Sequence, residues 1–376
     1  MNEIRIVKVA SRREMDDFIH VVDRIYRDYP QYVPDLESDV RGLFSIKTNP
    51  GLEFSDIQPF VAYQDHQVVG RIVGIVNRKA NEKWKTNNVR FSMIEFVDDM
   101  NVSKALIEAV EHWGRSLGME NIHGPLGVTD FDKEGMLIED FDLTGSITSI
   151  YNPPYYPRHM EAMGFTKEVD WLQVRINVPE EIPARYVRVA QYARESIGLT
   201  VKKYPIRKLM GEVGHKVFNL FNTAYAQIFG FSELSPKQID HFLKKYLRIV
   251  DPQLIPIIEN DKHEVVGAAV TIGTLAKALQ KSHGRLLPFG WFHLLRSLKW
   301  KHEESAEMLL IAIRPDYQGL GVNAMFFDDL IPILNKYGIK WAETGPQLED
   351  NVRELTQWKP LKPAYVKRRR CYTKKL

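Results

Sequence analysis

Hydrophobic and polar positions along this chain predict the same succession of elements twice. Residues 60–70 and residues 255–267 each hold two apolar runs around a polar turn and end in Val-Val-Gly, which predicts a β-hairpin in both places. A short apolar segment and an amphipathic helical pattern precede each hairpin, at residues 4–26 and 199–228. The chain is therefore predicted to hold two copies of one mixed α/β (α+β) unit, each a central sheet flanked by helices.

The two copies differ in length at one place. Each hairpin is followed by a helix that ends in glycine, a short strand and a Gly-Pro break, with Gly124 and Gly345 at the matching breaks. Gly70 and Gly267, which end the hairpins, lie 197 residues apart, whereas the breaks lie 221 residues apart. The second copy therefore carries about 24 extra residues, which we place at residues 275–304.

Prolines mark the connection between the copies. Pro179 and Pro183 precede a helical pattern from Ala184 to Ile197. We expect an N-terminal domain at residues 1–178, a linker with a helix at 179–198, and a C-terminal domain at 199–376.

The second copy contains a glycine-rich turn between a strand and a helix. An apolar run ends at Ile313, the turn Arg-Pro-Asp-Tyr-Gln-Gly-Leu-Gly follows, and a helical pattern begins at Ala324. Glycines at such a junction let backbone N–H groups point outward together at a helix N-terminus. The turn therefore predicts a site for a phosphate or a diphosphate.

Two known patterns fit this turn. Gly319-x-Gly321-x-x-Ala324 matches the dinucleotide-binding fingerprint, with Glu343 about twenty residues on as its ribose acid. In that pattern, however, the strand runs directly into the first glycine, whereas five residues including Pro315 intervene here. Only about fifty residues follow the turn, which leaves little room for the second half of a dinucleotide domain.

The residues from Gln318 to Gly321 resemble the Q/R-x-x-G-x-G/A pyrophosphate loop of the GCN5-related N-acetyltransferase (GNAT) superfamily. With the repeat, nearly the whole chain resembles a tandem GNAT protein. That resemblance implies acetyl-CoA or another acyl-CoA as cosubstrate and a small-molecule amine as acceptor, with the amine attacking the thioester directly. The cofactor-binding residues that it implies are Ile313, Gln318, Gly319, Leu320, Gly321, Val322, Asn323 and Asn351.

The resemblance also suggests catalytic residues. GNAT proteins often carry Asn-x-x-Ala-x-x-x-Tyr on the helix after the cofactor strands; Asn351 fits the asparagine, Glu354 stands in for the alanine, and Trp358 occupies the tyrosine position. An indole N–H is no proton donor near neutral pH, so the expected acid is missing and Tyr365 or Tyr372 is an alternative. Glu343, at the end of the next strand, is either a base or a solvated strand end.

The first copy is predicted to have lost the cofactor site. Its matching segment, residues 96–105, has no glycine, and Asp98 and Asp99 would repel a diphosphate. One of these two or Asn101 is expected to cap a helix at residues 102–117. Nearby, Tyr155 and Tyr156 either line an acceptor pocket or pack as structural aromatics.

Two further segments carry open alternatives. The insertion at 275–304 is rich in large apolar and cationic residues, and it predicts a lid, a membrane-surface patch or packing at the domain junction. The terminal run from Lys367 to Arg370 predicts a final strand with a basic rim.

Composition excludes several classes of protein. With 44% hydrophobic and 26% charged residues, a formal net charge of +3 and a single cysteine, Cys371, the chain is expected to be a cytoplasmic protein without nucleic-acid partners, disulfides or integral membrane association. Its eleven histidines form no metal-binding motif, so no metal site is expected. Two other functions stay open, a catalytically silent acyl-CoA-binding protein and a Fem-like transferase that uses aminoacyl-tRNA.

Overall fold

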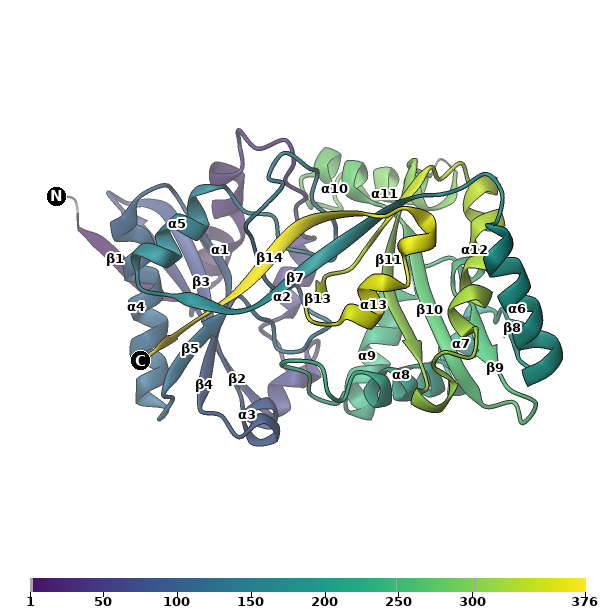
Figure 1. The fold of residues 1–376 in the computed structure, drawn as a ribbon. Helices are drawn as coiled ribbons and strands as arrows, with labels where there is room; N and C mark the ends of the chain where they lie inside the picture. The colour runs from purple at the N-terminus through teal and green to yellow at the C-terminus, as the bar shows by residue number, and fades with distance from the viewer. Residues whose placement is uncertain (1–2, 248, 301) are drawn as a thin grey trace. The chain divides into compact units, whose positions relative to one another are not determined.

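A computed structural model describes residues 3–247, 249–300 and 302–376 of the chain, which folds into two compact units (Figure 1). Unit 1 takes the described residues of Met1–Leu172, Leu279–Pro288 and Lys367–Leu376. Unit 2 takes those of Gln173–Ala278 and Phe289–Val366. Each unit has a mixed sheet with helices packed on it, as the repeated pattern predicts.

The sheet of unit 1 has the strand order β1-β2-β3-β4-β5-β14. Its pairs are antiparallel except for the parallel pair of β4 and β5. The expected hairpin is β2 and β3, and the expected amphipathic helix is α1, which begins with a capping box at Ser11 and Glu14. The elements are β1 (Ile4–Lys8), α1 (Arg12–Ile25), α2 (Glu37–Gly42), β2 (Ser55–Gln64), β3 (Gln67–Asn77), α3 (Arg78–Trp84), β4 (Asn88–Phe96), α4 (Met100–Ser116), β5 (Asn121–Gly124), β6 (Met136–Leu137) and α5 (Tyr155–Ala162).

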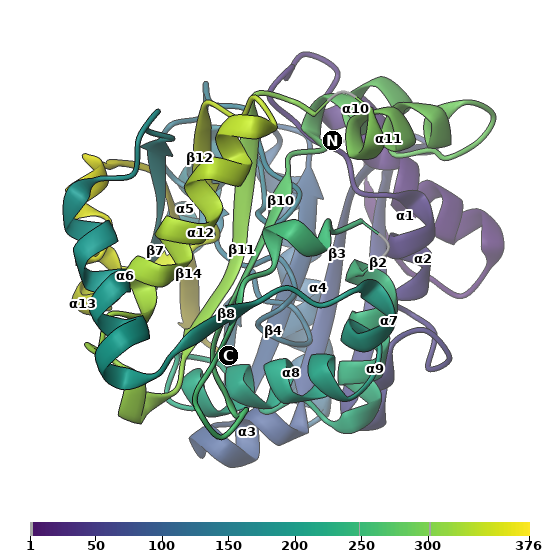
Figure 2. The ribbon, with the colours of Figure 1, turned by 90° about the vertical axis from the view of Figure 1, so that its right-hand side faces the viewer.

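Unit 2 repeats this plan with the order β8-β9-β10-β11-β12-β7. Its parallel pair is β11 and β12, and the predicted linker helix is α6, which Figure 2 shows beside α12. The elements are α6 (Ala184–Ile197), β8 (Thr200–Lys202), α7 (Ile206–Leu209), α8 (Glu212–Ala224), α9 (Pro236–Tyr246), β9 (Ile257–Glu259), β10 (Val265–Gly273), α10 (Ala276–Ser282), α11 (Gly290–Lys299), β11 (Ser305–Ile313), α12 (Val322–Lys336), β12 (Trp341–Thr344), β13 (Gln347–Leu348) and α13 (Val352–Thr356).

Two long strands, β7 (Thr166–Asn177) and β14 (Ala364–Lys375), each contribute to both units. The last half of β7 pairs with β12 in unit 2, with Asn177 opposite Trp341. The last part of β14 pairs with β5 in unit 1, with Tyr372 opposite Gly124. The expected N-terminal domain, 1–178, thus includes the end of β7, which belongs to unit 2. The expected C-terminal domain, 199–376, includes the end of β14, which belongs to unit 1.

The prediction of a basic rim at the chain's end is wrong. Arg369 is buried in unit 1, where its guanidinium donates to Ser149 Oγ over 2.8 Å. Arg370 forms two bonds to Asp170, of 2.8 and 3.0 Å. Burial disfavours the ionised form of Asp170, yet this guanidinium holds the pKa of the carboxyl below its usual value. These cations are internal because β14 lies between β5 and β7 in the strand order, and Asp170 belongs to β7.

The insertion at 275–304 forms α10, a loop and α11. Residues 279–288 belong to unit 1, where Gln280 Nε2 donates to the carbonyl oxygens of Pro30 and Tyr32 and Arg285 pairs with Asp23 and Glu37. Residues 289–299, which include α11, belong to unit 2. Among the described residues no helix is both long enough and apolar enough to cross a membrane.

Candidate functional site

The C-terminal half of β11 has one edge that no described strand covers. Parallel pairing with β12 runs from Ser305 to Met308 and closes with the bond from Gly345 N to Met308 O, at 3.0 Å. From there β11 continues alone on that side as far as Ile313. A β-bulge in the β10–β11 register, between Val270 and Thr271, marks the same level of the sheet. The pairing of β11 with β12 therefore ends where the GNAT resemblance implies that a pantetheine arm enters.

The backbone of Ile313 and of Ile311 faces this open edge. Arg314 N donates to Val266 O over 2.9 Å, and residues of an antiparallel strand alternate between bonded and non-bonded pairs. Ile313 lies opposite Gly267 and Ile311 opposite Ala269 in the non-bonded positions. Their N–H and C=O groups are therefore directed away from β10, as a bound extended ligand would need.

Side-chain contacts stabilise the turn after β11. Arg314 pairs with Asp316 at 2.8 Å and with Glu264 at 3.1 Å, and its guanidinium stacks over the ring of Tyr317. Gln318 Nε2 donates to Ile313 O over 3.3 Å. These contacts fix the path of the chain into the two glycines, and Arg314 neutralises the acids nearest the turn.

Both glycines of the turn have left-handed backbones, with φ of 82° at Gly319 and 92° at Gly321. A Cβ on Gly321 would also lie 2.9 Å from Val189 Cγ1 of α6. Gly321 is the N-cap of α12, and no side chain caps the helix there. The first N–H groups of α12 are therefore available to an anion, and Leu320, Val322 and Asn323 complete the predicted turn. Asn323 Oδ1 is buried without a hydrogen-bond partner in the described chain.

Tyr225, the residue after α8, reaches the open edge with its hydroxyl. The hydroxyl donates to Ile311 O over 2.8 Å and accepts from Ile311 N over 3.3 Å. Burial raises the pKa of Tyr225, and the nearby carboxylate of Glu354 raises it further. The phenol is therefore a neutral donor at physiological pH. The sequence analysis missed this residue, although Tyr26, which follows α1, marks the same position in the first copy.

Glu354 stands at the alanine position of the GNAT helix pattern, and the sequence predicted no chemical role for it. It lies on α13, where Asn351 Oδ1 caps the helix by accepting from Glu354 N over 3.3 Å. Gln347 Nε2 donates to its carboxylate over 3.2 Å. Burial raises the pKa of Glu354 to about 7, so this carboxyl exchanges a proton near neutral pH. A carboxyl with a pKa near neutral pH is suited to general acid–base catalysis.

The two predicted catalytic residues lie in unit 2 with their side chains engaged. Glu343 is buried on β12, accepts from Arg175 over 2.8 and 3.2 Å, and accepts from Gln173 Nε2 over 3.1 Å. Tyr365 is half exposed and its hydroxyl donates to Leu355 O over 3.2 Å, which attaches it to α13. Glu343 and Tyr365 stay predictions as catalytic residues; the contacts of Glu343 give it a positioning role for β7 and β12.

Trp358, at the position of the expected tyrosine, is a core residue. Its side chain is 2% exposed and meets the ring of Phe327 at 5.4 Å. Its indole N–H is buried with no hydrogen-bond partner among the described residues. The indole therefore fills space beside α12, whereas the hydroxyl of the half-buried Tyr225 bonds to the edge of β11.

Unit 1 closes the corresponding edge with its own side chains. Phe96 matches Ile313, because Phe96 pairs with Gly70 as Ile313 pairs with Gly267. Phe96 N donates to the hydroxyl of Tyr156 over 2.8 Å, and the hydroxyl of Tyr155 donates to Phe96 O over 2.6 Å. The rings of Phe96 and Tyr156 stack at 4.0 Å. The two tyrosines are therefore packing residues, which decides between the two interpretations offered for them.

The helix after this edge is also closed. Asp99 caps α4 by accepting from Asn101 N over 2.8 Å, which confirms the predicted capping role. Asp98 lies 2.9 Å from His159 Nε2. Carboxylates thus occupy the helix N-terminus that binds an anion in a pyrophosphate loop.

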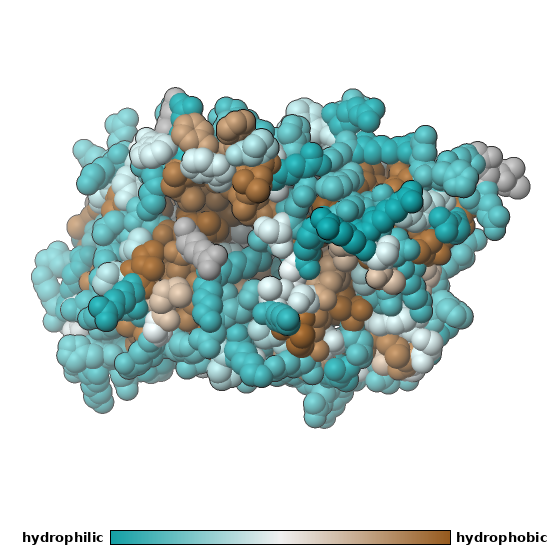
Figure 3. All heavy atoms as spheres, turned by 180° about the vertical axis from the view of Figure 1, so that it is seen from behind, coloured by the Kyte–Doolittle hydropathy of each residue, from teal (hydrophilic) through white to brown (hydrophobic). Residues whose placement is uncertain are grey.

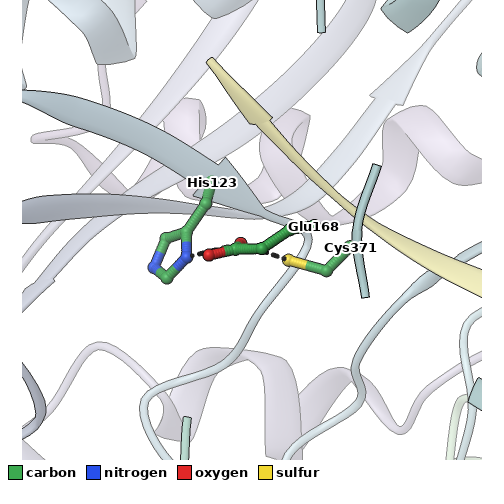
Figure 4. A group of neighbouring side chains, drawn as sticks. All are labelled: His123, Glu168 and Cys371. Carbon is green, nitrogen blue, oxygen red and sulfur yellow. Dashed lines mark hydrogen bonds and ion pairs between the residues drawn. The ribbon is translucent and has the colours of Figure 1, made fainter. Parts of the chain in front are cut away.

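Unit 1 contains one cluster with metal-ligand chemistry, shown in Figure 4. His123 of β5, Glu168 of β7 and Cys371 of β14 place one ligand atom each within 4.8 Å of one another. His123 Nδ1 lies 3.0 Å from Glu168 Oε2, and the thiol donates to the same oxygen over 3.3 Å. Burial lowers the pKa of His123 and raises that of Cys371, so both groups are neutral at physiological pH. The cluster is a hydrogen-bonded triad, and we assign no metal to it.

No family model matches the chain. Protein YghO of Escherichia coli K12 is 27% identical over 311 residues, which cover 82% of this chain and 78% of that protein. The bacterial ceramide synthase of Caulobacter vibrioides is 25% identical over 317 residues, which cover 84% of this chain and 82% of that protein.

A solved tandem GNAT protein from the clavulanic acid biosynthesis pathway superposes with a TM-score of 0.59 at 10% identity and covers 99% of this chain and 98% of its own. This chain has the tandem GNAT fold, which confirms the fold that the glycine turn and the repeat implied.

Proposed function

We propose that this chain is an N-acyltransferase that takes an acyl group from an acyl-CoA and transfers it to a primary amine in unit 2. The observation that carries the proposal is the edge of β11 from Leu309 to Ile313 on the side of β12, which no strand of the described chain covers and which leads through the glycine turn to a helix N-terminus without a side-chain cap. That arrangement offers amide groups to an extended, amide-containing arm and N–H groups to a diphosphate.

The chain's own groups would hold the donor as follows. The backbone of Gly319–Asn323 and the dipole of α12 bind the diphosphate, and the N–H and C=O of Ile313 bind the pantetheine amides. Ile311 N, which donates to Tyr225 in this structure, would exchange that bond for one to the thioester carbonyl and polarise it. No metal is needed for these contacts.

Acyl transfer forms a C–N bond as the C–S bond breaks. Of the three protons on the acceptor's ammonium group, one stays on the amide nitrogen, one moves to the sulfur and one leaves to solvent. Glu354, whose pKa is about 7, accepts a proton from the ammonium group. The neutral phenol of Tyr225 donates to the departing sulfur and recovers its proton through Glu354.

The name of one relative suggests which class of amine is the acceptor substrate. Ceramide is the amide of a fatty acid and a long-chain amino alcohol, so a ceramide synthase joins a fatty acyl group to a lipid amine. The similarity to such a protein over 84% of this chain supports a fatty acyl-CoA as donor and a long-chain primary amine as acceptor.

The test is an assay of free coenzyme A release with acyl-CoAs of short to long chain and with amines from ethanolamine to a long-chain amino alcohol. We expect turnover that needs both substrates and increases with the chain length of each. Binding of acyl-CoA without turnover on any amine would make the chain a silent binding protein, the function that Trp358 favours. Absence of acyl-CoA binding would refute the proposal and favour a donor of the Fem type.

A further inference from the structure

The surface of α11 combines exposed aromatic rings with cations. Phe289 is 72% exposed, Trp291 49%, Phe292 41% and Trp300 66%. The rings touch one another, with Trp291 6.0 Å from Phe292 and Phe292 6.1 Å from Trp300. Figure 3, which views the molecule from behind, shows hydrophobic residues gathered at the upper left, where α11 lies. Scattered exposed apolar residues are ordinary, whereas a contiguous aromatic patch of this kind marks an interaction surface.

The charged side chains of α11 itself are all cationic, although Glu303 and Glu304 follow the helix soon after Trp300. From Val265 to His302 the sequence has six lysines and arginines and no aspartate or glutamate. On α11 itself, Arg296 and Lys299 are exposed on the same side as Trp291 and Phe292, and neither pairs with a carboxylate in the described part of the chain. Ser297 is buried, and the leucines at 294, 295 and 298 are half-buried.

We propose that α11 and its flanking residues Phe289 and Trp300 dock unit 2 on an anionic lipid membrane surface. Tryptophan and phenylalanine enter the boundary between headgroups and acyl chains, while arginine and lysine extend to the phosphates. A protein partner would be expected to offer a fitted pocket, whereas exposed aromatic rings beside the exposed cations Arg296 and Lys299 fit a fluid anionic surface.

The patch and the glycine turn lie at opposite ends of β11. Ser297 Oγ lies 3.5 Å from Thr274 O, and Thr274 N donates to Ser305 O over 3.0 Å. Helix α11 is thus attached at the start of β11, and the glycine turn lies at the end of the same strand. Docking does not require acyl transfer, so the inference goes beyond the proposed function and can fail separately from it.

The test is sedimentation of the full chain with vesicles of phosphatidylcholine alone and of phosphatidylcholine with an equal part of phosphatidylglycerol. We expect binding to the mixed vesicles that weakens as salt rises. The double variant Trp291→Ser with Phe292→Ser should bind at least tenfold more weakly, and Arg296→Gln with Lys299→Gln about fivefold more weakly for each charge removed. Tyr192→Ser on α6, where the side chain is 59% exposed, is the matched control and should bind as the parent does.

Circular dichroism and thermal unfolding establish that the variants fold, and light scattering reports their mass. The proposal is overturned if the parent does not sediment with mixed vesicles, or if the aromatic double variant binds them equally. It is also overturned if the parent is a dimer that the double variant breaks and neither binds vesicles, because the patch is then a contact between copies. Coenzyme A release from soluble substrates should be unchanged in all variants, which separates this test from that of the proposed function.

Discussion

The ends of β4 and β11 are the same part of a repeated unit, and they are completed in opposite ways. In unit 1 the hydroxyls of Tyr155 and Tyr156 satisfy the backbone of Phe96, and Asp99 caps the following helix. In unit 2 the matching Ile313 faces an open edge, and the following helix begins at a glycine with no side-chain cap. Unit 1 thus covers both the strand end and the helix N-terminus with side chains. In unit 2 the hydroxyl of Tyr225 bonds to Ile311 and Gln318 bonds to the carbonyl of Ile313, but no side chain caps the helix N-terminus.

The largest expected effect comes from Glu354 of α13. Glu354→Gln keeps the shape and removes the base, so we expect kcat to fall about 10²–10⁴-fold while acyl-CoA affinity stays within a few fold. In the parent, kcat/KM should rise with pH and level off above about pH 7, because the ionised carboxyl is the active form. A parent profile that is flat from pH 5 to 8 would contradict this assignment.

Stability supplies a second readout for the same variant. The pKa of Glu354 lies above its ordinary value of 4.5, so the contribution of the protonated carboxyl is present in full below about pH 4.5 and is lost as the pH rises through about 7. Glu354→Gln should therefore be more stable than the parent at pH 8, by about 2 kcal/mol, and lose this advantage at pH 4. Urea unfolding at the two pH values measures the difference.

The next effect concerns Tyr225, whose hydroxyl faces the open edge. Tyr225→Phe should lower kcat about 10²-fold, because the departing sulfur loses its proton donor. Folding should be nearly unaffected, with a loss of about 1 kcal/mol for the bonds to Ile311. Single-turnover kinetics at saturating substrate isolate the chemical step, and an unchanged rate there would remove Tyr225 from the mechanism.

A smaller effect is expected at the turn. Leu320 is partly exposed beside the helix N-terminus, so Leu320→Glu places a carboxylate near the diphosphate without a packing change. We expect acyl-CoA affinity to fall about tenfold at low salt and less at high salt. Leu320→Gln is the matched neutral control, and calorimetric titration measures both. Equal affinity for the two variants would place the diphosphate elsewhere.

The smallest functional effect should come from the closed edge. Tyr156→Phe removes the acceptor of Phe96 N and a donor to the buried Glu95, which should destabilise unit 1 by about 1–3 kcal/mol. Acyl-CoA affinity and kcat should stay unchanged at temperatures where the variant is folded. A loss of acyl-CoA affinity in this variant would show that unit 1 takes part in binding.

Much of the fold follows from local pattern. The Val-Val-Gly hairpins, the linker helix from Ala184 to Ile197 and the glycine turn were predictable, because each depends on periodicity, capping or backbone freedom within a short segment. The exchange of β7 and β14 between the units was not predictable in this way, because the partner of a strand is decided by distant chain. The same reason made Arg369, a surface residue by type, a buried one.

The candidate site also has a part that was predictable from the sequence and a part that was not. The turn from Gln318 to Asn323 lies in one continuous segment, and its glycines have the left-handed backbones that the pattern requires. Tyr225 and Glu354 come from separate helices, and their relevance depends on burial and on a contact with the backbone of Ile311. The sequence held one signal for Tyr225, because Tyr26 follows the matching helix of the first copy. Using that signal would have required the exact last residue of both helices.

Hydrogen–deuterium exchange of the full chain with saturating coenzyme A tests the central claim most directly. The account predicts new protection in peptides that cover residues 309–323, where the open edge and the uncapped helix lie, with no change in peptides that cover residues 94–103. Protection at residues 94–103, or no protection at 309–323, would contradict it.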